Sequence, residues 1–289
     1  MRWNGLRLSV TLLTAIPLRG AVPVSSPQAS GAAKQQATSA SPVDPATVAA
    51  AMAWAPAVGL LLGIIAAAVL LTADHPLGAG PLTSAALAVA ALAVLSRGLH
   101  LDGLADLADG LGSGKPGPAA LDIMRRSDIG PFGVVTLVLT LLIQVAALSH
   151  AESSGPGRGA AALIAATVTG RLALTWACRR GVAAARPDGL GALVAGSVRP
   201  AIPAAATVAT LAAAVAAVAV PAALFSATGA GEPLGWTLPL AVVAGLGAGF
   251  GVQQHAVRRL GGITGDVLGA LAEVAATVTL VVAAMGRPA

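Results

Sequence analysis

The chain of 289 residues contains a single cysteine, Cys178, and no tyrosine. One cysteine excludes an intrachain disulfide and any metal site built from several thiolates. Aromatic residues make up 2% of the chain and charged residues 10%, whereas hydrophobic residues make up 56%. Long apolar runs with so little charge are typical of an integral membrane protein rather than a soluble domain. Only four tryptophans are left to mark the membrane interfaces.

Seven apolar segments approach or exceed the roughly 20 residues that a helix needs to cross the hydrocarbon core. The sequence therefore predicts an all-α polytopic membrane protein that forms one domain over residues 1–289. The expected spans are Thr47–Thr72, Pro81–Leu99, Phe132–Ser149, Ala160–Cys178, Ala201–Phe225, Gly235–Gln253 and Val267–Met285.

The N-terminal segment differs from these spans. Leu6–Leu18 is short, carries Arg7 and ends near Pro17, which favours an interfacial or re-entrant helix over a cleaved signal peptide. Whether this helix crosses the membrane is left open. Residues 20–46 are rich in Ala, Ser, Pro and Gln, and we expect them to form a flexible insertion.

The basic residues predict the orientation. If the N-terminus is cytoplasmic, fourteen of the seventeen lie on the cytoplasmic side, Arg158 and Arg287 lie outside, and Arg171 lies within a span. The positive-inside rule favours this topology, which also puts the aspartates described below on the cytoplasmic face. Because the basic residues sort by membrane side, the net charge of +5 does not indicate binding to nucleic acid.

Three aspartates stand in an otherwise apolar stretch, Arg97–Gly110. Asp102, Asp106 and Asp109 follow the spacing i, i+4, i+7, which places them on nearly one face of a helix. Like charges at this spacing repel one another, so a cation is expected among them. A solvated helix face is the alternative. Carboxylates are the ligands of hard ions, and we expect Mg²⁺ at this site, near the cytoplasmic boundary of the second span.

His100 precedes the first aspartate by two positions, so on a helix it points away from the Asp102 face. Direct metal ligation by His100 is not expected. A role as general base or phosphate ligand and a plain interfacial histidine are both compatible with this position.

The segment Asp122–Gly133 leads into the third predicted span. Arg125 and Arg126 could bind phosphate beside the first N–H groups of a helix, or they could anchor the chain to the cytoplasmic face. Ser127 or Asp128 could cap that helix, or Ser127 could contact substrate, and Pro131 suits the first helical turn.

Charged residues within or beside later spans are further candidates. Arg171 is costly in an apolar span, which favours a functional role or pairing with a buried acid. Glu273 is the simplest partner for it. Asp266 follows the glycine-rich segment Leu260–Gly265, where it could cap the last span or supply another metal oxygen on the same side as the aspartates.

Three segments together resemble the cobalamin synthase family of adenosylcobinamide-GDP ribazoletransferases: Leu99–Gly110, Asp122–Gly133 and Gly261–Ala270. The stretch Ala185–Gly191 adds weaker support, and the similarity covers nearly the whole chain. The second segment departs from the frequent family pattern, because here a base precedes Ser127 and an acid follows it.

The resemblance implies a multi-pass, Mg²⁺-dependent enzyme of the bacterial inner membrane. It would join adenosylcobinamide-GDP to α-ribazole, or to α-ribazole 5′-phosphate, and release GMP with adenosylcobalamin or its 5′-phosphate. Asp102, Asp106 and Asp109 would hold the metal, and one of them or His100 would accept the proton of the attacking hydroxyl. Arg125, Ser127, Arg171 and Asp266 would contact substrate. Membrane lipids surround such a protein, and a homo-oligomer or an association with other enzymes of the pathway is compatible with it.

Two other classes fit parts of the pattern. A CDP-alcohol phosphotransferase also places aspartates at a membrane boundary, but its motif has Arg after Asp-Gly-x-x-Ala, where this chain has Asp106. A transporter would place its site near the midplane of repeated halves, whereas this sequence shows no internal repeat and its acids lie toward one face.

Overall fold

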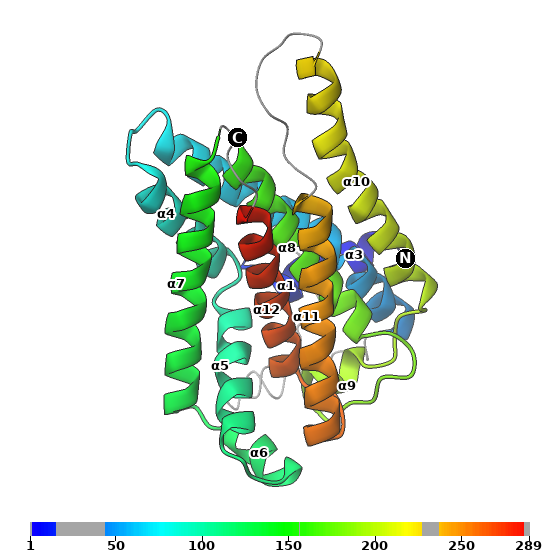
Figure 1. Cartoon of the computed structure of the whole chain (residues 1–289). Coiled ribbons are helices and arrows are strands. Elements are labelled where there is room, and N and C mark those ends of the chain that lie inside the picture. Colours follow the sequence, from blue (N-terminus) through cyan, green and yellow to red (C-terminus); the bar gives the residue numbers. More distant parts are fainter. Residues whose placement is uncertain (1, 16–43, 156, 227–236, 286–289) are drawn as a thin grey trace.

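The computed structural model describes residues 2–15, 44–155, 157–226 and 237–285 (Figure 1). In these ranges the chain forms eleven α-helices and two isolated β-bridges, which confirms the predicted all-α fold. The helices are α1 (Arg2–Leu13), α3 (Pro45–Asp74), α4 (Pro81–Leu95), α5 (Leu99–Gly112), α6 (Gly117–Ile123), α7 (Pro131–Ser153), α8 (Arg158–Ala177), α9 (Gly189–Val194), α10 (Ala201–Ser226), α11 (Thr237–Leu260) and α12 (Gly265–Ala284).

Six of these helices are long and apolar enough to cross a membrane: α3, α7, α8, α10, α11 and α12. They confirm six of the predicted spans, with ends that differ by a few residues. The largest difference is in α11, which continues to Leu260 instead of ending at Gln253. The protein is therefore a polytopic membrane protein, whose long helices form the bundle in Figure 1.

The predicted second span, Pro81–Leu99, is wrong as one straight helix. α4 ends at Leu95, and α5 leaves it at an angle of 88°. The break lies at Arg97 and Gly98, which both have positive φ values, of 54° and 66°. Left-handed backbone cannot continue a right-handed helix, so the chain turns there and the aspartate segment becomes a separate helix. Together α4 and α5 are long enough to form one broken span or a re-entrant loop.

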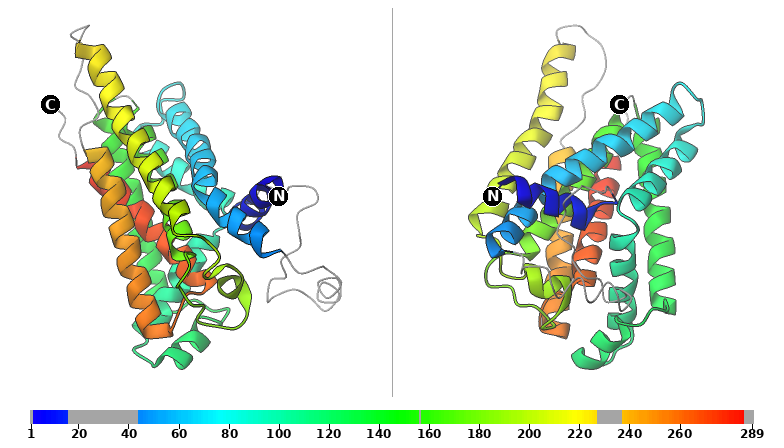
Figure 2. Two further views of the ribbon diagram at one scale, coloured as in Figure 1. Left: turned by 90° about the vertical axis from the view of Figure 1, so that its right-hand side faces the viewer. Right: turned by 180° about the vertical axis from the view of Figure 1, so that it is seen from behind.

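The N-terminal helix α1 has 12 residues, so it is about 18 Å long and too short to cross the membrane alone. It lies across α3 in Figure 2. Gly5 of α1 allows close contact with Ala50 of α3. Most of the expected insertion at residues 20–46 lies outside the described residues. Its last three belong to the start of α3, where Asp44 accepts a hydrogen bond from the backbone N–H of Ala46.

Small residues let the central helices approach closely, as is common between helices in membranes. A Cβ atom at Gly59 on α3 would lie 2.5 Å from the carbonyl oxygen of Thr167 on α8. Gly170 on α8 is equally close to Ala272 on α12. The outer side of α7 instead exposes large apolar side chains, as a lipid-facing surface does; these are Phe132, Val134, Val135, Val138, Leu139, Leu142 and Ile143.

Candidate active site

The side chains of the three aspartates on α5 become less exposed to solvent from Asp102 to Asp109. Asp102 is exposed, Asp106 is half-buried and Asp109 is buried. α5 packs tightly on α12, because a Cβ atom at Gly103 would lie 2.8 Å from the carbonyl oxygen of Asp266. This packing brings Asp266, from a distant part of the sequence, beside the aspartates of α5. The structure thus places all four predicted carboxylates at one end of the bundle.

Asp109 has hydrogen-bonding partners that the sequence did not suggest. Its carboxylate accepts hydrogen bonds from the backbone N–H of Gly130, at 2.7 Å, and of Gly133, at 2.9 Å. These groups belong to the first turn of α7, so Asp109 caps that helix from α5. Of the alternatives for Ser127 and Asp128, the structure excludes the helix cap, since Gly130 occupies the N-cap position of α7.

At the start of α12, the structure excludes one of the two alternatives for Asp266, the helix cap. The cap is Thr264, whose hydroxyl accepts a hydrogen bond from the N–H of Val267 at 3.2 Å. Asp266 therefore does not cap the helix, and one of its oxygens accepts a hydrogen bond from the Thr264 hydroxyl at 3.2 Å. Asp266 remains half-buried beside the carboxylates of α5, where it contributes negative charge.

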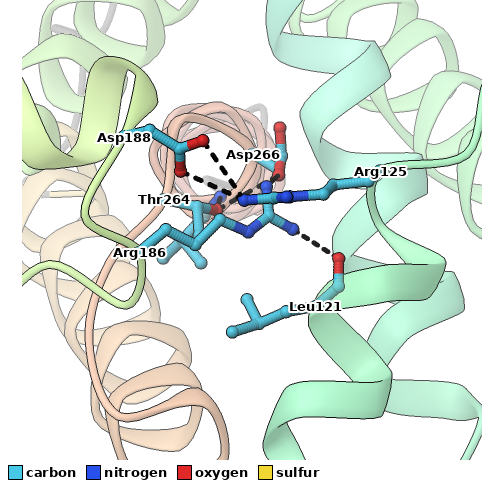
Figure 3. A network of polar contacts seen from close by, with 7 residues as sticks. Leu121, Arg125, Arg186, Asp188, Thr264 and Asp266 are labelled. Atoms are coloured by element: carbon cyan, nitrogen blue, oxygen red, sulfur yellow. Dashed lines mark hydrogen bonds and ion pairs between the residues drawn. The ribbon is translucent and has the colours of Figure 1, made fainter.

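Arg186 supplies the positive charge nearest to these carboxylates. The loop between α8 and α9 pairs with the segment before α12 through Ala183, Ala185 and Ile263, which fixes the position of Arg186. Its guanidinium lies 3.8 Å from the Asp266 carboxylate and donates a hydrogen bond to the carbonyl oxygen of Leu121 (Figure 3). Burial lowers the pKa of Arg186 and Asp266 acts in the opposite direction, but the side chain stays charged at neutral pH.

Arg125 lies at the same end of the bundle as Arg186 but is more exposed to solvent. It forms an ion pair with Asp188 at 3.1 Å that joins the α6 region to the loop before α9 (Figure 3). Both side chains are more than half exposed, so the pair contributes little to stability. Arg126 and Ser127 are exposed as well. This loop presents polar groups at the mouth of the acidic site.

His100 and Arg171 meet inside the bundle. His100 is buried and directed away from Asp102, as its helical spacing predicts. Its Nδ1 atom lies 3.5 Å from the Arg171 guanidinium, which is also buried. Arg171 borders a cavity of about 30 Å³, which has room for about one or two water molecules.

Glu273 borders the same cavity, so Arg171 and Glu273 lie near each other, as the sequence predicts. The Glu273 carboxylate accepts its hydrogen bond from Gln144, at 3.0 Å. In the described residues, no ion pair within 4.0 Å joins Arg171 to Glu273, and the attraction between them acts at longer range. Gln144 is a polar residue of α7 that sequence reasoning missed.

Negative charges outnumber positive charges around Asp106. Asp106 feels the negative charges of Asp102, Asp109 and Asp266, and the positive charge of Arg186. A bound cation would relieve this repulsion. No three of these carboxylates bring one oxygen each within 4.8 Å of one another. Among the described residues, a group that meets this criterion lies at the opposite end of the bundle. A cation here would therefore draw these carboxylates closer together, with water or substrate oxygens completing its shell.

Arg186 was also missed as a site residue. Its segment, Ala185–Gly191, contributed to the family resemblance without a role being assigned. The available signal was an arginine followed by Pro-Asp-Gly in a loop on the aspartate side. Nothing local in the sequence indicates that this loop pairs with Ile263 and reaches Asp266, because those residues are about eighty positions apart.

A bundle of membrane helices with four carboxylates and an arginine at one end defines a polytopic membrane protein with an acidic site. The family model for cobalamin-5-phosphate synthase matches residues 5–284. The chain belongs to this family and is, as the sequence predicts, a membrane transferase of cobalamin synthesis.

Curated relatives carry the name adenosylcobinamide-GDP ribazoletransferase. The protein of Frankia casuarinae is 42% identical over 289 residues, which cover 98% of this chain and 95% of the relative. The protein of Bradyrhizobium diazoefficiens is 37% identical, with coverage of 81% and 84%, and that of a Nocardioides species is 36% identical, with coverage of 82% and 88%. No solved structure matches the chain.

Proposed function

We propose that the chain joins adenosylcobinamide-GDP to α-ribazole, or to α-ribazole 5′-phosphate. The products are adenosylcobalamin, or its 5′-phosphate, and GMP. The observation that carries this proposal is the similarity to named ribazoletransferases over almost the full chain, including the segments Leu99–Gly110 and Gly261–Ala270. The gathering of four carboxylates and Arg186 at one end of the bundle supports it.

The reaction is a phosphoryl-type transfer. A ribose hydroxyl of the acceptor attacks the phosphorus on the corrinoid side of the pyrophosphate, a new P–O bond forms, and the bond to the GMP oxygen breaks. The hydroxyl proton passes to a base, and GMP carries away the electron pair of the broken bond. In such reactions positioning and charge neutralisation supply most of the catalysis.

The donor set fits Mg²⁺, which prefers carboxylate and water oxygens and keeps part of its hydration shell. Asp102 and Asp106 would hold it, because they are the more accessible carboxylates of α5. Asp109 would contribute through the remaining lone pairs of oxygens that already accept N–H groups, and Asp266 lies beside them. When bound, Mg²⁺ would neutralise pyrophosphate charge and assist the departure of GMP.

The side chains themselves divide the remaining tasks. Arg186 would bind a phosphate oxygen, because its Nε–H is buried without a hydrogen-bonding partner and its charge faces the site. Arg125 and Ser127, at the mouth, would contact the nucleotide end of the substrate. An aspartate of α5 would accept the hydroxyl proton, since Asp102 and Asp106 are more accessible than buried His100. His100 and Arg171 would act as positioning residues behind α5.

The site would face the cytoplasm of a bacterial cell, at the inner membrane. Arg125, Arg186 and Arg259 lie in contacts at the same end of the bundle as the aspartates, and the positive-inside rule favours the cytoplasmic side for such an end. Asp109 lies level with the first turn of α7, where lipid-facing apolar side chains begin at Phe132. Asp102 lies about 10 Å deeper along α5. Water and a water-soluble nucleotide could reach carboxylates at that depth.

The test uses detergent-purified protein with adenosylcobinamide-GDP, α-ribazole and Mg²⁺, and follows corrinoid products and GMP by chromatography. We expect equal amounts of both products, and none without metal. A parallel assay with α-ribazole 5′-phosphate compares kcat/KM for the two acceptors. Folded protein that forms no product with either acceptor would contradict the proposal. Binding of Mg²⁺ without any product would favour a transporter instead.

A further inference from the structure

A second group of ionisable side chains lies at the other end of the bundle. Asp74 and His75 occupy the end of α3, and Glu152 lies in the last turn of α7. Glu152 is twenty-one residues beyond Pro131, so about 30 Å of helix separates it from the end that holds Asp109. One ligating atom from each of the three residues lies within 4.8 Å of the others. This group takes no part in the proposed reaction.

Glu152 is unusual within this group because it is buried without hydrogen bonds. Its side chain is 1% exposed, and neither carboxylate oxygen has a hydrogen-bonding partner. The N–H groups of Gly159 and Ala160, at the start of α8, face it without reaching good hydrogen-bonding geometry. A buried, unbonded carboxylate is costly in a protein interior, so a further partner is expected.

The three side chains lie near one another without forming hydrogen bonds. His75 Nε2 lies 3.8 Å from a Glu152 oxygen, and His75 Nδ1 lies 3.9 Å from an Asp74 oxygen. Both distances exceed those of hydrogen bonds. These two distances involve different ring nitrogens of His75, and an ion binds only one of them. One ligand atom from each residue lies within 4.8 Å of the others, against about 3.3–3.6 Å around a tetrahedral zinc ion, so side-chain movements of about 1 Å would complete a metal shell.

The charge of the surroundings also favours a cation. Two carboxylates lie beside one imidazole, and the C-terminal ends of α3 and α7 add partial negative charge. The N-terminus of α8 offsets a small part of this. Imidazole nitrogen with carboxylate oxygen selects borderline transition-metal ions over Mg²⁺ and Ca²⁺, and three protein ligands leave a fourth position for water.

We propose that Asp74, His75 and Glu152 form a binding site for a divalent transition-metal ion of the zinc type, at the end of the bundle opposite the aspartates of α5. His75 is 57% exposed, which leaves an entry path for the ion. The bound ion would tie the turn between α3 and α4 to the end of α7, and it would stabilise the folded protein without entering the reaction.

The test is zinc binding by the full chain, purified in detergent with a histidine-free tag and stripped with EDTA. Zn²⁺ is titrated against a competing chromogenic chelator in excess Mg²⁺, which occupies hard-ion sites. We expect one tight equivalent in the wild type, and a dissociation constant raised roughly tenfold or more by His75→Ala or Glu152→Gln. His150→Ala is the matched control, because it removes an exposed histidine two residues from Glu152 and should bind like the wild type.

Thermal unfolding gives a second readout that does not depend on the assay of activity. Zinc should raise the midpoint of the wild type and of Asp106→Asn, and should leave that of His75→Ala unchanged. Wild-type protein that binds no zinc, or His75→Ala and Glu152→Gln variants that both retain wild-type affinity, would overturn the proposal. Loss of the zinc equivalent in Asp106→Asn would also overturn it by assigning the ion to the other end.

Discussion

The carboxylate of Asp109 lies 2.7 Å from the backbone nitrogen of Gly130 and holds the first turn of α7 against α5. One side chain of the aspartate segment is thus a structural cap as well as a candidate metal ligand. Asp102 and Asp106 are more exposed and make no such contact with α7 in the described structure. The three aspartates should therefore respond differently to substitution.

We predict that Asp109→Ala destabilises the protein by about 2–4 kcal/mol, because the buried N–H of Gly133 and the partly buried N–H of Gly130 lose their charged acceptor. Asp109→Asn keeps one acceptor and should lose about half as much. The measurement is the thermal unfolding midpoint in detergent, with Asp102→Asn as the control that keeps the wild-type midpoint. Equal midpoints for Asp109→Ala and wild type would show that the cap does not contribute to stability.

Asp106→Asn should abolish turnover without unfolding the protein. The substitution preserves side-chain volume and removes a charge that would hold Mg²⁺, so we expect kcat to fall by at least about 10²- to 10³-fold. Product formation and the unfolding midpoint are measured on the same preparation. A folded Asp106→Asn variant with normal turnover would refute the proposed metal site.

Removing the metal should have the same effect as removing its ligand. Treatment with EDTA is expected to stop product formation, and added Mg²⁺ should restore it. Ca²⁺ should restore much less, because its longer bonds and irregular coordination fit a pyrophosphate bridge poorly. The check is a rate titration with each ion, and full activity in excess EDTA would contradict a metal-dependent reaction.

Arg186→Gln should weaken phosphate binding. Loss of a charged hydrogen bond of about 1.5–3 kcal/mol lowers kcat/KM about 10- to 100-fold. Arg258→Gln, which removes an exposed arginine from the last turn of α11, is the matched control and should leave kcat/KM unchanged. Steady-state rates over a range of adenosylcobinamide-GDP concentrations give kcat/KM for both variants. An equal fall in kcat/KM for Arg186→Gln and Arg258→Gln would show that only general positive charge matters.

The contact between α5 and α12 depends on Gly103. Gly103→Ala places a methyl group 2.8–2.9 Å from the backbone of Asp266, which must separate the helices and should cost about 1–3 kcal/mol of stability. Activity should fall too, because Asp266 moves relative to the aspartates of α5. Gly251→Ala on α11 meets nothing within 4 Å and should be neutral or slightly stabilising. A lower unfolding midpoint for Gly251→Ala than for Gly103→Ala would contradict the packing role of Gly103.

Local features of the sequence determined the class of fold and the acidic helix. Apolar runs of about 20 residues must cross the membrane as helices, because their backbone groups find no other hydrogen-bonding partners there. The i, i+4, i+7 spacing likewise fixed the shared direction of Asp102, Asp106 and Asp109 on α5. The quoted motifs also predicted the family to which the chain belongs.

Contacts between distant segments were decided by the tertiary structure alone. The left-handed backbone at Arg97 and Gly98 separated α4 from α5, although the local hydropathy reads as one span. Asp109 replaced Ser127 and Asp128 as the cap of α7, and Thr264 replaced Asp266 as the cap of α12. The pairing of Ala185 with Ile263 brought Arg186 to Asp266. Such partners depend on how helices pack, and helix packing depends on shape across the whole bundle, which no local spacing encodes.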